Sequence, residues 1–98
     1  MNKSELVVSL ARCTSLSVGL SRTVIDSIFD PDPASGLIAR ELLAGRRVSI
    51  SGFGTFEARP RKARVGRNPQ TGAALSIPAS RAPAFRPGKP LKEAFRAH

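Results

Sequence analysis

Features that would support catalysis, a metal site or a membrane span are scarce in this sequence. The 98 residues include one cysteine (Cys13), one histidine (His98) and no tryptophan or tyrosine. A single cysteine excludes an internal disulfide framework and a cysteine-rich zinc site, and one histidine leaves no cluster for a catalytic triad or a metal. The longest apolar run is far shorter than the roughly 18 residues that a membrane span needs. We therefore expect neither an enzyme nor a membrane protein, and no metal, cofactor or small-molecule substrate.

Acidic residues are scarce in only one half of the chain. Lysine and arginine number 16 against 7 aspartate and glutamate residues, a formal net charge of +9. Residues 1–45 carry a net charge of −1, because four cations face five acids, whereas residues 46–98 carry +10, because twelve cations face Glu57 and Glu93. A basic half joined to a near-neutral half is typical of proteins that bind polyanions. Glu5 stands where a secretory signal would begin its apolar stretch, so we expect no such signal.

The first half of the sequence predicts helices. Asn2 followed by Glu5 is a capping box for a helix over about residues 3–14, and Ser17 can cap a second helix. Apolar residues recur at helical spacing in both segments. The run Asp30-Pro31-Asp32-Pro33 interrupts the second helix, with Asp32 placed to cap a restarted helix that Gly45 ends.

Beyond Arg46 the pattern predicts strands. Val48 and Ile50 alternate with serines, which favours a strand ending at the turn Gly52-Phe53-Gly54. Two further strands are predicted over residues 55–65 and 74–82, joined by a turn at 68–72, and a short helix over 89–97 follows the break at Pro87-Gly88. The predicted order is therefore two or three helices, three strands and a final helix.

Residues 59–67 contain five cations and no acid. Unpaired charges of this density cannot line a protein core. If this segment pairs with residues 74–82, the resulting ribbon has few apolar side chains to bury and should stand out from the body. A two-stranded ribbon fits a nucleic-acid groove, and guanidinium groups suit phosphate oxygens. The alternative interpretation is a solvated basic surface or a disordered basic tail.

Pro69 and the pair Lys3 and Asp26 each have two possible interpretations. Pro69 can simply preset the backbone of a tight turn, or its exposed ring can act as an apolar wedge between base pairs, and both can hold together. Lys3 and Asp26 are most simply surface charges. If the two lie close in space, Lys3 could alternate between an ion pair with Asp26 and a contact with phosphate.

The protruding ribbon and the number of aromatic residues together predict a dimer. If about residues 58–82 protrude, only about seventy residues remain to build a core, which is too few for comfortable stability alone. Pairing two copies would cover the aromatic side chains and place two basic ribbons on one side of the assembly. The predicted dimer core consists of Phe29, Phe53, Phe56 and Phe85.

Four segments resemble the bacterial HU/IHF histone-like proteins, and the resemblance runs nearly end to end. They are residues 1–6 (MNKSEL), 50–56 (ISGFGTF), 66–72 (GRNPQTG) and 83–89 (PAFRPGK). The resemblance implies an α+β fold and an intertwined dimer with a helical base, a saddle-shaped three-stranded antiparallel sheet, two long β-ribbon arms and a short C-terminal helix. It also implies that the arms wrap the minor groove and bend DNA, and that the protein acts in the cytoplasm, at the nucleoid.

The resemblance also assigns roles to residues. Pro69 is implied as the intercalating residue, with Arg67 and Asn68 beside it. The implied arm contacts are Arg59, Arg61, Lys62 and Arg64, and the implied saddle and flanking contacts are Arg81, Arg86, Lys89 and Lys3. The sequence departs from the shorter family form by an apparent insertion at residues 30–35, by Pro60 within the arm strand, and by Ala73-Ala74 where acidic residues are expected.

We therefore expect one domain over residues 1–98, with a helical dimerisation base at 1–45, a saddle and C-terminal helix at 46–57 and 82–98, and a DNA-binding arm at 58–81. The predicted function is architectural binding of duplex DNA with little sequence preference. An RNA-binding or ribosome-associated basic protein is the alternative, although the lack of aromatic residues in the arm disfavours base stacking on single strands. A nucleotide-dependent enzyme has no catalytic cluster to support it.

Overall fold

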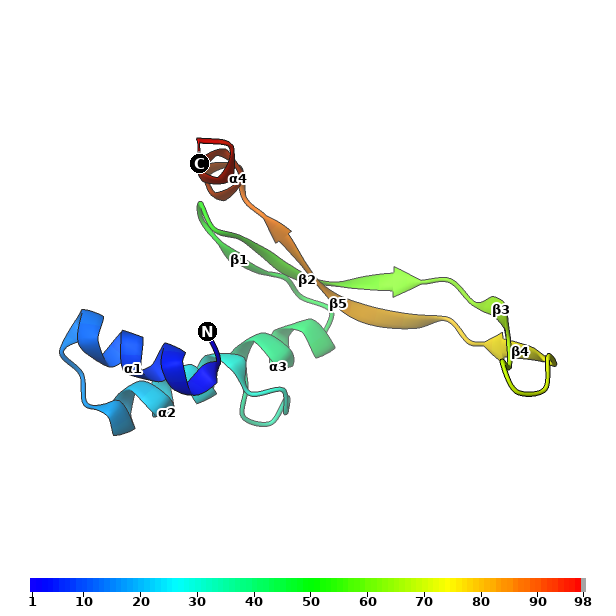
Figure 1. Ribbon diagram of the computed structural model, residues 1–98, viewed down its shortest axis with the longest axis horizontal. Helices are drawn as coiled ribbons and strands as arrows, with labels where there is room; N and C mark the ends of the chain where they lie inside the picture. Colours follow the sequence, from blue (N-terminus) through cyan, green and yellow to red (C-terminus); the bar gives the residue numbers. More distant parts are fainter. Residues whose placement is uncertain (98) are drawn as a thin grey trace. The chain divides into compact units, whose positions relative to one another are not determined.

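The computed structural model describes residues 1–97 and has the α+β composition that the sequence predicts (Figure 1). The chain forms two compact units, Met1–Ala44 and Gly45–His98, which we call the helical unit and the sheet unit. His98, the one histidine of the sequence, lies outside the described residues.

The helical unit begins with two helices that pack against each other, α1 (Lys3–Thr14) and α2 (Val18–Phe29). Both predicted caps are confirmed, because the Asn2 side chain accepts a hydrogen bond from the Glu5 backbone N–H at 2.9 Å and Ser17 accepts one from Leu20 at 3.0 Å. The buried residues of the two helices follow helical spacing and comprise Val7, Ala11, Ser21 and Ile25.

The third helix, α3 (Leu37–Leu43), begins later than the sequence predicts. The expected start at Asp32 and Pro33 is wrong: residues after Asp32 form a hydrogen-bonded turn in which the Asp32 carbonyl accepts from the Ser35 and Gly36 N–H groups. Gly36 is then extended and caps α3. A Cβ at Gly36 would lie 1.9 Å from the Asp30 carbonyl oxygen, so this close approach admits only glycine.

The loop before that turn is held by its own acidic side chains. The Asp30 carboxylate accepts a hydrogen bond from the Asp32 backbone N–H at 2.9 Å, and Asp32 in turn accepts one from Ala34 at 2.9 Å. The hydrogen bond from the Asp32 backbone lowers the pKa of Asp30 from its ordinary value. These local bonds explain why the helix does not continue through residues 30–35.

The sheet unit is built on a three-stranded antiparallel sheet in the order β1-β2-β5. The strands are β1 (Val48–Ile50), β2 (Gly54–Arg61) and β5 (Ser80–Pro87). β5 runs to Pro87, whereas the sequence predicts an end at Ala82. Proline lacks a backbone N–H but is tolerated in β5 because β5 is an edge strand, whose outer side pairs with no other strand among residues 1–97.

Beyond the end of β1, strands β2 and β5 continue as a hairpin that is formed by β3 (Arg64–Arg67) and β4 (Ala74–Ile77) (Figure 1). The pairing Arg61↔Ser80 is followed by Arg64↔Ile77, so the register is preserved across the interruption. The predicted continuous strands are therefore each divided in two, at residues 62–63 and 78–79. Pro78 lacks the N–H that the ladder would need there.

Helix α4 (Lys89–Ala97) closes the chain where the sequence predicts it. It lies at the end of the three-stranded sheet opposite to the hairpin (Figure 1). Among the helices that the structure describes, none has the length and apolar character required to span a bilayer.

Candidate nucleic-acid interface

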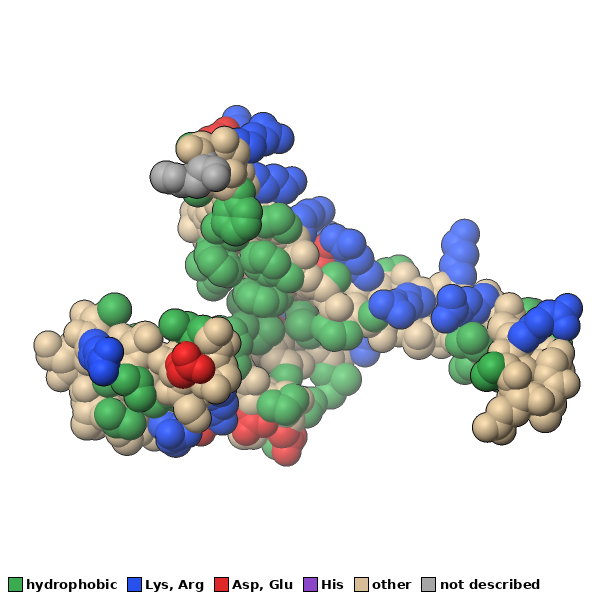
Figure 2. All heavy atoms as spheres, in the orientation of Figure 1, with side chains coloured by type: hydrophobic (Ala, Val, Ile, Leu, Met, Phe, Trp, Pro, Cys, Tyr) green, Lys and Arg blue, Asp and Glu red, His purple; other side chains and the backbone are tan. Residues whose placement is uncertain are grey.

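The three-stranded sheet has two chemically different faces. Side chains alternate along a strand and cross-strand partners share a face, so the register assigns each position. The polar face carries Ser49, Thr55, Glu57, Arg59, Arg61 and Arg86. The apolar face carries Val48, Ile50, Phe56, Ala58, Pro83 and Phe85. Figure 2 shows Lys and Arg side chains along one side of this unit and hydrophobic side chains gathered on another.

Glu57 is the acidic centre of the polar face. Its Oε1 accepts a hydrogen bond from Arg59 Nε at 3.1 Å, and its Oε2 lies 3.7 Å from both Arg47 Nε and Arg86 Nη2. The hydrogen bond from Arg59 lowers the pKa of Glu57 from its ordinary value of 4.5, with smaller contributions from the charges of Arg86, Arg59 and Arg47. Glu57 is therefore ionised at neutral pH.

Arg47 is a candidate residue that sequence analysis missed. It precedes β1, and the pairing Val48↔Phe56 places it across from Glu57. The alternation of Val48 and Ile50 with serines indicates that Arg47 lies on the same face as Ser49. The sequence does not show that Glu57 is the neighbour of Arg47 on β2, because this depends on the strand register. The structure thus adds Arg47 to the predicted Arg59 and Arg86.

The hairpin arm, residues 58–81, contains cations without any acid. No aspartate or glutamate occurs between Glu57 and Glu93, so no carboxylate within the arm can neutralise its charge. Arg61 ends β2, Lys62 lies at the interruption and Arg64 begins β3. All three are exposed. The arrangement gives a ribbon with a large excess of positive charge, which attracts an anionic partner.

The tip of the arm is held by hydrogen bonds within the turn. The Asn68 side chain accepts from the Gln70 N–H at 2.9 Å, and the Asn68 carbonyl accepts from the Gly72 N–H at 2.7 Å. Arg67 Nη1 donates to the Gly72 carbonyl at 3.1 Å, and Gly72 adopts the positive φ of +70° that favours glycine. The turn leaves Pro69 exposed between these contacts.

Arg81 and Lys89 lie apart from the other predicted saddle residues. Arg81 pairs with Pro60, which places it on the opposite face from Arg59 and Arg86, and its Nη1 lies 3.8 Å from the position of a Cβ built on Gly45. Lys89, in the first turn of α4, lies 3.9 Å from Glu93. The structure therefore brings together Arg59 and Arg86 of the predicted contacts, but does not add Arg81 to their cluster.

Lys3 belongs to the helical unit. Its Nζ forms an ion pair with the Asp26 carboxylate, so the spatial proximity that the sequence analysis considered is present. Both side chains remain substantially exposed, at 60% and 42% of their areas. An exposed pair of this kind contributes little to stability, so little free energy is lost when it opens.

Three of the four predicted dimer-core phenylalanines meet in the sheet unit. The Phe85 ring lies 5.5 Å from that of Phe53 and 4.9 Å from that of Phe56, between ring centroids. In the single chain Phe53 and Phe85 keep exposures of 48% and 40%. The fourth, Phe29, ends α2 in the helical unit and is also exposed.

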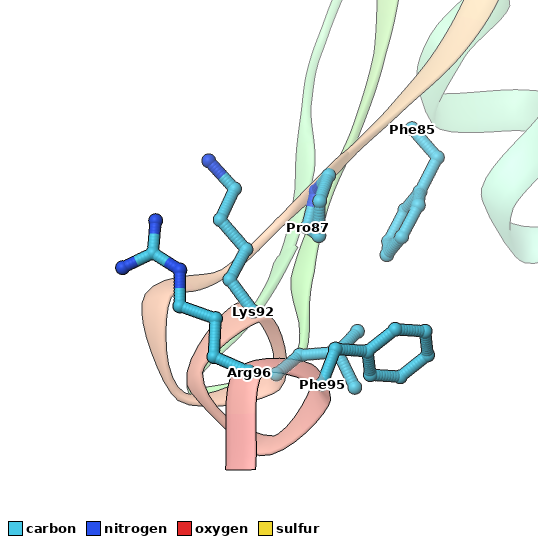
Figure 3. Close-up of a pocket in the computed structure, with 6 residues that line it drawn as sticks. Phe85, Pro87, Lys92, Phe95 and Arg96 are labelled. Carbon is cyan, nitrogen blue, oxygen red and sulfur yellow. The ribbon is translucent and has the colours of Figure 1, made fainter. Parts of the chain in front are cut away.

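An apolar pocket continues this cluster toward α4. It encloses about 420 Å³ and is lined by Phe85, Pro87, Leu91, Lys92, Phe95 and Arg96. Figure 3 shows the Phe85 and Phe95 rings on one side, while the Lys92 and Arg96 side chains point to the other. The sheet unit thus leaves a continuous apolar surface uncovered in one copy of the chain.

The lowered pKa of Glu57 predicts a pH dependence of stability. A carboxyl whose pKa is lowered by folding stabilises the fold above its unfolded value, here about 4.5, and this contribution is lost as the pH falls through the folded value. We expect the melting temperature of the unaltered protein to fall relative to that of Glu57→Gln as the pH drops from 6 to 3, measured by circular dichroism. A constant difference between the two proteins across this range would contradict the prediction.

Comparison with known proteins assigns this geometry to a family. A family model described as bacterial DNA-binding protein matches residues 1–96. The chain is 46% identical over 96 residues to the DNA-binding protein HU of Geobacillus stearothermophilus, covering 98% of this chain and 100% of that protein. It is 47% identical over 94 residues to DNA-binding protein HU 1 of Bacillus subtilis (strain 168), covering 96% of each. Both relatives are named as DNA-binding proteins, which agrees with the prediction of a DNA-binding protein that is not an enzyme.

Solved structures agree with the fold. An Anabaena HU–DNA cocrystal structure superimposes with a TM-score of 0.85 at 40% identity, covering 97% of each chain. A mutant of HU from Thermotoga maritima gives a TM-score of 0.67 at 27% identity, covering 97% of this chain and 99% of that one. The predicted resemblance is therefore confirmed, and the chain belongs to the HU family of bacterial DNA-binding proteins.

Proposed function

We propose that this chain is an architectural protein that binds duplex DNA through the minor groove as a homodimer, and that it bends and compacts the DNA with little sequence preference. The observation that carries the proposal is the acid-free hairpin arm, whose cations cannot be neutralised within the arm itself. The names of the relatives and the HU–DNA cocrystal structure support DNA as the partner. Such a protein would act in the cytoplasm, at the nucleoid.

The contacts of the arm favour the DNA backbone and the minor groove. Arginine side chains suit phosphate oxygens and narrow, negative grooves, and a two-stranded ribbon is thin enough to follow a groove. We assign the arm contacts to Arg59, Arg61, Lys62, Arg64 and Arg67. Arg47, Arg86 and Lys89 complete the proposed surface of the sheet unit, Lys3 is a separate proposed contact of the helical unit, and Arg81 stays a prediction from the resemblance. Phosphate contacts carry no base information, which accounts for the proposed lack of sequence preference.

The electrostatic part of the proposal predicts a steep salt dependence. If the five arm cations of each chain each neutralise one phosphate, the proposed dimer neutralises ten, and a plot of log affinity against log salt concentration should have a slope of about −9, because each contact releases condensed counterions. Fluorescence anisotropy with duplex DNA, kinked DNA and structured RNA would measure the slope and the preference together. A slope near zero would refute the electrostatic account, and preferential binding of RNA would favour the ribosome-associated alternative.

The exposed ring at the arm tip supports a wedge that kinks the duplex. Pro69 stands between hydrogen bonds that fix the turn on both sides, so an inserted ring would be held in place. We expect Pro69→Ala to reduce the bend angle more than the affinity, measured by energy transfer between dyes at the two DNA ends. Gln70→Ala is the matched control at the same tip, and it should leave the bend unchanged. A full bend at saturation with Pro69→Ala would reject the wedge.

The uncovered apolar surface supports the homodimer. A second copy would bury Phe53, Phe85 and Phe95, which one chain leaves between 40% and 80% exposed. We expect sedimentation to give twice the chain mass of 10.4 kDa and the melting temperature to rise with protein concentration. Phe85→Ala should cost about 3–5 kcal/mol and weaken association, whereas Val65→Ala, in the arm, should leave association unchanged. A monomer whose melting temperature is independent of concentration would contradict the dimer.

A further inference from the structure

We propose that Glu57 is a positioning residue for DNA binding, which holds the guanidinium groups of Arg47, Arg59 and Arg86 in one array on the polar face of the sheet. The inference rests on the proposed function and adds a role for the single acidic side chain of that face. A carboxylate on a surface that binds phosphate weakens the attraction between them, so its presence there needs a compensating physical effect.

The carboxylate lies beneath the three arginines. The Glu57 side chain is 12% exposed, whereas those of Arg47, Arg59 and Arg86 are 70%, 55% and 53% exposed. Glu57 and Arg59 belong to β2, Arg86 belongs to β5, and Arg47 precedes β1. One carboxylate therefore connects cations from all three parts of the sheet, and each guanidinium group keeps a side that faces solvent.

The atoms involved leave the guanidinium groups able to bind phosphate. Arg59 and Arg47 approach the carboxylate through Nε, at 3.1 Å and 3.7 Å. A guanidinium group has five N–H donors, and the four on its terminal nitrogens remain available when Nε is used. Phosphate accepts such donors in pairs, so the carboxylate can fix each side chain without occupying all of its phosphate-binding donors.

The compensating effect is the ordering of three long side chains. Without an anion among them, three neighbouring guanidinium groups repel one another and occupy many rotamers. Each would then lose conformational entropy when it met a phosphate. With Glu57 in place, much of that ordering is present before DNA arrives. The carboxylate reduces the net charge of the face but increases the number of cations that are already positioned.

Two substitutions separate position from charge. Glu57→Asp keeps the charge but withdraws the carboxylate by one methylene, and we expect about 5- to 10-fold weaker binding of a linear duplex, with a salt slope shallower by about 1–2. Glu57→Gln raises the net charge by one and should still bind about 3-fold more weakly or worse. Glu5→Gln, in the helical unit, makes the same charge change as a control, and we expect no weakening of binding.

A purely electrostatic role makes the opposite forecast. Glu57→Asp would then bind as the unaltered protein does, and Glu57→Gln would bind more tightly, as Glu5→Gln would; either result overturns the positioning role. Failure of the unaltered protein to bind duplex DNA would instead overturn the proposed function. The two failures are therefore distinguishable in one set of titrations, with melting temperatures confirming that each variant is folded.

If the variants do not fold, the unaltered protein provides a second test. The Nε–H of Arg59 donates to Glu57, whereas for Arg61, two residues further along the same face, no ion pair is found among residues 1–97. Nitrogen-15 relaxation should therefore report an ordered Nε–H for Arg59 and a mobile one for Arg61 in the absence of DNA. Equal mobility at the two sites would overturn the proposal.

Discussion

The alternation of side chains along β2 and β5 is the constraint on which the sheet unit depends. The same eight-residue pairing places Phe56 and Phe85 on one side and Glu57, Arg59 and Arg86 on the other. A shift of register by one residue would exchange the two sets. The apolar side leaves aromatic side chains partly exposed and the polar side carries an excess of cations, so one pattern of pairing provides the surfaces for both the proposed second copy and the proposed DNA partner.

The distribution of acids divides the polar surface into two regimes. At the root of the arm, Glu57 offsets part of the charge of three arginines, and their side chains are held by a carboxylate. Further along, no acid exists between Glu57 and Glu93, so the arm keeps a large excess of positive charge. The carboxylate contacts at the root thus limit the freedom of three arginines, whereas the excess charge of the arm strengthens its attraction to an anionic partner.

Local chemistry decided which parts of the fold were predictable from the sequence. The caps at Asn2 and Ser17 depend on neighbouring residues and were predicted. The predicted start of α3 at Asp32 and Pro33 was wrong, because Gly36 approaches Asp30 through a turn that helix signals do not reveal. The extension of β5 to Pro87 depends on its edge position, and Arg47 depends on the register of β1 with β2. Pairing between distant strands, which periodicity does not specify, accounts for both omissions.

The interruption of the hairpin has a mechanical consequence. Two cross-strand pairs are missing between Arg61↔Ser80 and Arg64↔Ile77, yet the count of residues on the two strands stays equal. A ladder without bonds at one point resists bending less, while the paired segments on either side of that point keep the same register. The arm can therefore bend at the unpaired stretch without a change in strand register. The eight residue-to-residue steps from Arg61 to Pro69 span at most about 26 Å at roughly 3.3 Å each, and this length limits how far from the sheet the proposed wedge could reach.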